Sequence, residues 1–173
     1  MGLFDRRSLP ADAAASLSRH LADQGRRTPR VLAWAATDDG VLVGLPDRLA
    51  VLGADGWVDV PWHTVQSASW ADDGSAFTWS TVDAPQRTST VPVTAPGRLP
   101  EVVRERVEQT FVVQRNVQLA PGRGAIVSGR RPAEGSGALS WHIAPVRGVN
   151  LADPALAEAA REMLERTRRD WGA

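Results

Sequence analysis

Between residues 30 and 93, short apolar runs alternate with polar turn signals. Seven such runs cover residues 31–37, 41–45, 48–52, 57–60, 65–71, 77–82 and 87–93. Three of the turns contain the pair Asp-Gly, at Asp39-Gly40, Asp55-Gly56 and Asp73-Gly74. Asp-Gly accommodates the positive φ that tight hairpin turns require. Runs of this length between such turns predict a seven-stranded antiparallel meander.

An amphipathic helix is predicted directly after the meander, over residues 99–110. Val103 and Val107 lie four positions apart on its apolar stripe, as the helical period requires. Pro100 suits the first turn, and Glu101 is favourable near the positive end of the helix dipole. A helix with this stripe is suited to cover an open sheet or the end of a barrel.

A second group of elements follows the helix. Strands are predicted over residues 111–119, 125–128 and 138–145, with a turn at 122–124. A final helix is expected after Asp153, which caps it, with Pro154 at its first position. Its apolar face carries Leu156, Ala160, Met163, Leu164, Thr167 and Trp171.

The pattern divides the chain into three parts. Residues 1–29 form an N-terminal helix, expected over 9–24 with Pro10 in its first turn, and a polar linker. Residues 30–111 form the meander and its helix. Residues 112–173 form a β-hairpin extension and the C-terminal helix.

Seven antiparallel strands closed by one amphipathic helix resemble the pleckstrin-homology-like (PH-like) fold. The resemblance covers residues 30–111, and its cues are the three Asp-Gly turns and the helix with Val103 and Val107. The chain also resembles small uncharacterised actinobacterial proteins that place a Trp before such a segment, as in Pro61-Trp62-His63-Thr64-Val65.

This resemblance implies an α+β protein, an antiparallel PH-like half-barrel closed by one helix, extended by a C-terminal β-hairpin unit and a terminal helix. It also implies a binding or scaffolding module. The first turn region, residues 37–41, is acidic and lacks the basic pair that phosphoinositide-binding members use.

Composition narrows the function classes. The chain has 20 acidic and 20 basic residues, a formal net charge of zero, and no Cys. The strong basic excess of a dedicated nucleic-acid binder is absent, so no nucleic-acid partner is expected. All basic residues are Arg, so a Schiff base, a Lys general base and a Cys nucleophile are excluded. The bias towards Arg, Ala, Gly and Val indicates a GC-rich bacterial genome.

The sequence also predicts where in the cell the protein is located. Residues 1–7 are charged, with no apolar core of a secretory signal behind them. No run approaches the 18 apolar residues of a membrane span. We expect a cytoplasmic protein, with peripheral membrane contact left open.

No motif predicts catalysis, a cofactor or a metal. The three histidines, His20, His63 and His142, are not at metal-ligand spacing. The paired aspartates at 38–39 and 72–73 are explained by turn chemistry. Gly122-Arg123-Gly124 lacks the third glycine and the following helix of a dinucleotide fingerprint, so it is interpreted as a hairpin turn.

The candidate binding residues are arginines and tryptophans. Arg123, Arg130 and Arg131 lie near one another in sequence, and Arg147 ends the next strand. Arginine forks bind phosphates and carboxylates. The seven tryptophans are expected in the core at Trp34, Trp70 and Trp79, whereas Trp57 and Trp62 flank a proline at a strand end and are candidates for a partner surface.

The expected function is therefore non-enzymatic: a protein-interaction or adaptor module that binds another protein through Arg123, Arg130, Arg131, Trp57 and Trp62. The alternative is peripheral binding to anionic lipid through the same arginines together with Leu3-Phe4 and Arg6-Arg7. A small enzyme or ligand-binding barrel is the third possibility, and it needs a pocket with converging polar groups.

Overall fold

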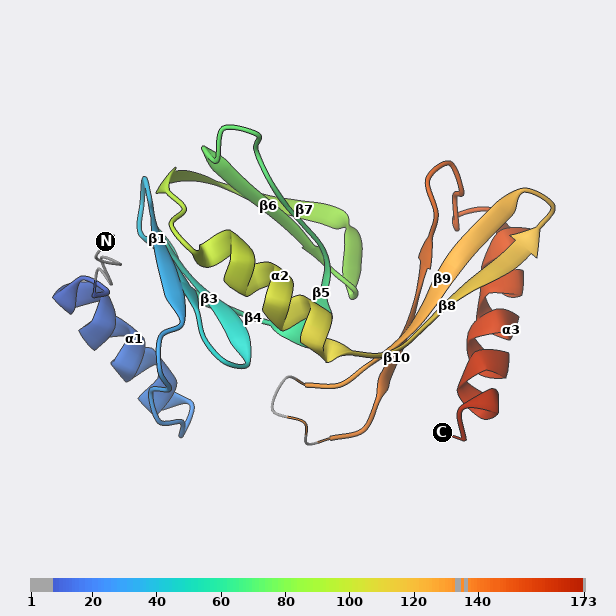
Figure 1. Ribbon diagram of the computed structural model, residues 1–173, viewed down its shortest axis with the longest axis horizontal. Coiled ribbons are helices and arrows are strands. Elements are labelled where there is room, and N and C mark those ends of the chain that lie inside the picture. The colour runs from blue at the N-terminus through green and yellow to red at the C-terminus, as the bar shows by residue number, and fades with distance from the viewer. Residues whose placement is uncertain (1–7, 133–134, 136, 173) are drawn as a thin grey trace, which may run out of the picture. The chain divides into compact units, whose positions relative to one another are not determined.

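The computed structural model describes residues 8–132, 135 and 137–172 (Figure 1). The chain divides into two compact units, Met1–Arg106 and Val107–Ala173. Leu3, Phe4, Arg6 and Arg7, the residues of the lipid-binding alternative, lie outside the described residues. None of the helices in the described part is long and apolar enough to cross a membrane.

The first unit is built on one antiparallel sheet of seven strands in the order β4-β3-β2-β1-β7-β6-β5 (Figure 1). The sheet is open, with β4 and β5 at its two ends. Its elements are α1 (Ala11–Asp23), β1 (Ala33–Thr37), β2 (Val41–Gly44), β3 (Arg48–Gly53), β4 (Gly56–Pro61), the 3-10 turn η1 (Trp62–Thr64), β5 (Val65–Trp70), β6 (Ala76–Thr81) and β7 (Ala84–Ala95). The helix α2 (Leu99–Thr110) begins in this unit, and its last turn belongs to the second.

Two helices cover opposite faces of the β1–β4 half of this sheet. Leu17 and Leu21 of α1 are fully buried in one cluster with Val41 and Val43 of β2. On the other face, a Cβ added to Gly44 would lie 3.1 Å from side chains of α2. Both faces of β2 are therefore covered, which explains why all its residues are buried although the sheet is antiparallel.

Aromatic side chains fill the interior of the first unit. Phe77 is fully buried, and its ring centroid lies 4.5 Å from that of Trp70 and 5.3 Å from that of Trp79. Trp79 is buried, and Trp34 is half-buried against the cluster under α1. Of the three tryptophans expected in the core, Trp79 is buried, whereas Trp34 and Trp70 are half-buried.

The Asp-Gly turns form at the predicted places, for two different reasons. Gly56 and Gly74 have φ of 103° and 72°, as the turn chemistry requires. In the Asp73-Gly74 turn, the backbone N–H of Ser75 donates to Asp73 Oδ1 at 2.9 Å. Hydrogen bonds from the Ser75 side chain and backbone lower the pKa of Asp73. Gly40 has no positive φ, but a Cβ there would lie 2.2 Å from a backbone oxygen of β3.

The second unit is a three-stranded antiparallel sheet, in the order β10-β9-β8, with one helix packed on it (Figure 1). Its elements are β8 (Phe111–Ala120), β9 (Arg123–Arg130), β10 (Ser140–Pro145) and α3 (Pro154–Asp170). Asp153 caps α3, because its side chain accepts hydrogen bonds from the backbone N–H groups of Ala155 and Leu156. Gly122, with φ of 69°, turns β8 into β9, so a strand follows this glycine motif, as predicted.

The α+β class and the large antiparallel sheet expected from the sequence are confirmed.

Candidate functional site

The predicted arginine cluster does not form one patch. Arg123 and Arg130 begin and end β9, and seven residue steps of about 3.3 Å separate them by about 23 Å. Pro145 pairs with Ala125, so Arg147 follows β10 at the Arg123 end of the sheet. The sequence prediction of a single site is corrected because an extended strand holds its two ends apart.

Arg130 is also packed rather than presented to solvent. Its side chain is 5% exposed, and its guanidinium lies over the Phe111 ring at 4.1 Å from the centroid. This is cation–π geometry. Burial lowers the pKa of Arg130. Arg131 is half-buried, with its backbone N–H donating to the Thr110 carbonyl at 2.9 Å. Of the four arginines, only Arg123 and Arg147 are exposed.

The two candidate tryptophans belong to the first unit and have structural contacts there. Trp62 is fully buried, and its indole N–H donates to the Leu45 carbonyl oxygen at 2.9 Å. This corrects its assignment to a partner surface, because the 3-10 turn after Pro61 directs the ring inward. Trp57 is half-buried; its N–H donates to Ser16 Oγ at 2.9 Å and its ring stacks on His20.

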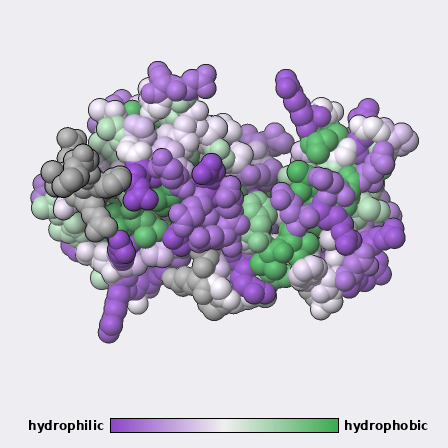
Figure 2. Space-filling view, viewed as in Figure 1, coloured by the Kyte–Doolittle hydropathy of each residue, from purple (hydrophilic) through white to green (hydrophobic). Residues whose placement is uncertain are grey.

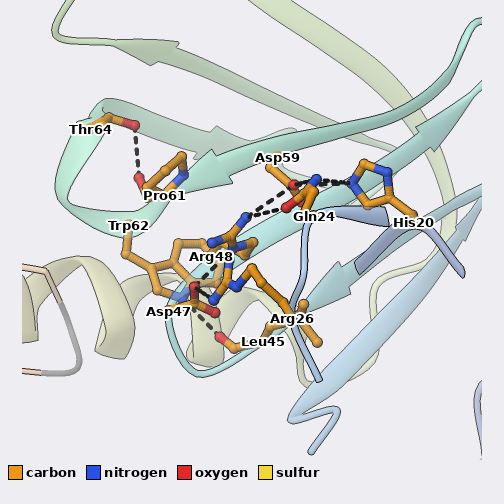
Figure 3. A network of polar contacts seen from close by, with 10 residues as sticks. All are labelled: His20, Gln24, Arg26, Leu45, Asp47, Arg48, Asp59, Pro61, Trp62 and Thr64. Atoms are coloured by element: carbon orange, nitrogen blue, oxygen red, sulfur yellow. Dashed lines mark hydrogen bonds and ion pairs between the residues drawn. The ribbon is translucent and has the colours of Figure 1, made fainter. Parts of the chain in front are cut away.

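A polar network lies beside Trp57, where the end of α1 meets β3 and β4 (Figure 3). Asp59 Oδ2 accepts hydrogen bonds from Gln24 Nε2 at 2.8 Å and Arg48 Nη1 at 3.0 Å, and it lies 3.0 Å from His20 Nε2. Asp47 Oδ2 accepts from Arg26 Nη2 at 2.6 Å and Arg48 Nε at 2.9 Å.

This network links α1 to the sheet through hydrogen bonds and ion pairs. One carboxylate oxygen of Asp59 is contacted by three side chains, two of them from α1 or the residue after it. Both carboxylates are mostly buried, with Asp47 12% and Asp59 15% exposed. A His–Asp pair supports proton transfer where the histidine faces a substrate, but this histidine is stacked on Trp57. Among the described residues, no group of three His, Cys, Asp or Glu is placed to hold a metal ion.

The second unit has a groove on its surface beside β8. Its volume is about 280 Å³, and it lies between β8 and the end of α3. Val112, Val113 and Arg115 line it from the strand, and Thr167, Asp170 and Trp171 from the helix and its cap. Figure 2 shows apolar surface over the strands of this unit, bordered by hydrophilic side chains.

Two large apolar side chains at the groove are exposed to solvent. Val112 is 40% exposed and Trp171 is 52% exposed, and they are two of the four such residues in the described part of the chain. A bulge explains Val112, because the register of β8 with β9 shifts between Phe111 and Val113. The extra residue is left out of the ladder, and such bulges re-aim side chains.

Charged side chains meet at the same groove. Arg115 Nη1 lies 3.3 Å from Asp170 Oδ2, and the two side chains are 56% and 53% exposed. An ion pair this exposed contributes little to stability. Both groups are accessible to a ligand.

The sequence pattern by itself does not predict this groove. Three consecutive apolar residues, Phe111-Val112-Val113, were one available signal, because a strand in regular alternation cannot direct all three to the same face. The helical period places Trp171 on the packed face of the last helix, whereas the structure leaves this side chain exposed.

No protein-family model, curated protein or solved structure matches this chain.

Proposed function

We propose that this chain is a non-enzymatic protein-interaction module, an adaptor, and that its first unit is a PH-like half-barrel. The strand order β4-β3-β2-β1-β7-β6-β5 and the packing of α2 on one face of the sheet support the PH-like assignment. One observation carries the function: the groove beside β8, with its two exposed apolar side chains. Accessible apolar surface bordered by polar groups is typical of protein-binding sites.

Other partner classes have less support. Lipid headgroups and nucleic acids require converging positive charge, whereas Arg123 and Arg130 lie at opposite ends of β9 and Arg130 is buried. The net charge of zero and the acidic turns of the first unit also argue against binding to lipid headgroups and nucleic acids. Binding to anionic lipid is therefore an outcome of the test below.

The experiment compares three forms of the full chain as bait in lysate of the source cells: wild type, Val112→Ser and Val58→Ser. Val58 is a matched control, because it is also an exposed valine, at 57%, and belongs to the first unit. We expect a discrete protein retained by wild type and Val58→Ser and lost with Val112→Ser. Circular dichroism verifies that both variants are folded.

Two results would overturn the proposal. One is the same set of retained proteins for all three baits. The other is flotation of the chain with anionic vesicles, sensitive to salt, with no protein partner retained. The second result would favour the lipid alternative.

A further inference from the structure

We infer that the sheet face beneath α1 is a second protein-binding surface, and that its ligand is an amphipathic helix of a partner protein that takes the place of α1. α1 is then an autoinhibitory cover. The ligand helix carries two apolar side chains four positions apart, as α1 does at Leu17 and Leu21, with an arginine at the position of His20. The inference does not depend on the groove beside β8.

The first argument is that α1 can leave without dismantling the sheet. α1 contributes no strand to the order β4-β3-β2-β1-β7-β6-β5. Leu42 and Leu49 alternate along β2 and β3 with the residues under α1, so they belong to the opposite face, and both are buried. That part of the core remains when α1 leaves. The start of α1 is weakly fixed, because Pro10 precedes the helix and provides no side-chain cap.

The second argument is that the face beneath α1 is apolar and wider than the helix covers. Leu17 and Leu21 lie in a buried cluster with Val41 and Val43. The apolar side chains around this cluster pack against it but are only partly buried: Leu9, Val31, Trp34, Leu52 and Trp57. α1 has only a half-buried alanine, Ala14, one turn before Leu17. A helix with a larger apolar side chain at that position buries more apolar area than α1 does, and helices bind other proteins through apolar anchors at this spacing.

The third argument is a carboxylate that α1 leaves partly unsatisfied. Three side chains contact Oδ2 of Asp59 (Figure 3). Its Oδ1 is buried and has no hydrogen-bond partner among the described residues, and a buried acceptor without a partner costs free energy. An arginine fork donates to both oxygens of one carboxylate, which the single contact from His20 Nε2 does not do.

The charges at this place also favour an arginine. Beneath α1, the sheet side of the network consists of Asp47, Asp59 and Arg48. Two carboxylates and one guanidinium leave an excess of one negative charge, which a cationic side chain of the ligand helix neutralises. Complementary charge guides association and selects partners.

The probe is a labelled peptide with the sequence of residues 8–26 that carries the changes Ala14→Leu and His20→Arg. A scrambled peptide of the same composition, with its leucines on different faces, is the control. Fluorescence anisotropy measures binding to the full chain as wild type and as Leu17→Ala. The chain variant weakens the cover and leaves every residue of the sheet unchanged.

We expect Leu17→Ala to bind the peptide more tightly than wild type by about tenfold or more, because wild type offers the face only in molecules whose α1 is undocked. Ala22→Ser is the matched control, since Ala22 is exposed on α1, and it should bind as wild type does. If circular dichroism shows that Leu17→Ala unfolds the sheet, Ser16→Ala is the milder variant, because it removes the hydrogen bond from Trp57.

A second comparison tests the arginine. The peptide with His20→Arg should bind Leu17→Ala more tightly than the same peptide with histidine, and the added change Asp59→Ala in the chain should abolish that difference. Equal binding of the two peptides to the Leu17→Ala chain would show that the arginine contact is wrong.

Three results overturn the inference. The first is no binding at millimolar peptide to a folded Leu17→Ala chain, and the second is equal binding of the designed and scrambled peptides. The third is a wild-type dimer in light scattering that Leu17→Ala dissociates, which would favour exchange of α1 between two copies of this chain. The proposed function fails separately, because Val112→Ser lies in the other unit and should leave binding of this peptide unchanged.

Discussion

Replacement of Asp59 by alanine tests whether the polar network holds α1 on the sheet. The variant removes the acceptor for His20, Gln24 and Arg48 at once (Figure 3). Arg48 keeps its contact with Asp47 at 2.9 Å. The expected result is weaker docking of α1 with the sheet intact, because the leucines under the helix remain buried.

The free-energy cost of Asp59→Ala follows from the burial of each side chain that contacts Asp59. Arg48 is 15% exposed and His20 21% exposed, so both lose a hydrogen bond that water replaces only in part. Loss of the hydrogen bond between the two charged groups, Arg48 and Asp59, costs about 1.5–3 kcal/mol. Loss of an ordinary hydrogen bond, the range that applies to His20, costs about 0.5–1.5 kcal/mol. The remaining Asp47 contact reduces the first figure, and Gln24 is exposed. The sum is about 2–3 kcal/mol.

Hydrogen exchange of the α1 amides measures this cost locally. A loss of 2–3 kcal/mol speeds exchange through opening of α1 by about 30- to 150-fold. The amides of α3, in the other unit, are an internal control. Asp55→Ala is the matched variant, because this aspartate is exposed in the turn between β3 and β4, and it should change exchange little. If Asp59→Ala and Asp55→Ala gave the same protection of α1, the network would have no docking role.

Two further substitutions test local features of the fold. Asp153→Ala should destabilise α3 by about 1 kcal/mol, whereas Asp153→Asn should cost much less, because asparagine also caps helices; exchange of the α3 amides checks both. Gly40→Ala should destabilise the first unit by about 2 kcal/mol, because its Cβ would lie 2.2 Å from a backbone oxygen. Gly53→Ala is the control in urea unfolding, since a Cβ there meets open space, and equal midpoints for the two variants would contradict the argument.

Local signals were sufficient to predict the elements. The helix expected over residues 99–110 has those bounds in the structure, because Pro100 and the valine stripe act within the helix itself. Asp153 caps α3 as expected for the same reason. The pairing of β1 with β7, through Ala36 and Ala95, joins segments far apart in sequence. No periodicity within either segment carries that information.

The candidate site required distances and exposure that a periodic pattern lacks. Arg123 and Arg130 are close in sequence, yet β9 holds them apart, because an extended strand advances more than twice as far per residue as a helix. Trp171 shares the helical face of Thr167, which is 4% exposed, but is itself 52% exposed. Periodicity gives the direction of a side chain around the helix axis and not whether another element lies opposite. At the end of α3 the opposite element is the bulged start of β8, and a bulge is a property of pairing between two strands. The groove therefore follows from the register of β8 with β9, which became known only with the structure.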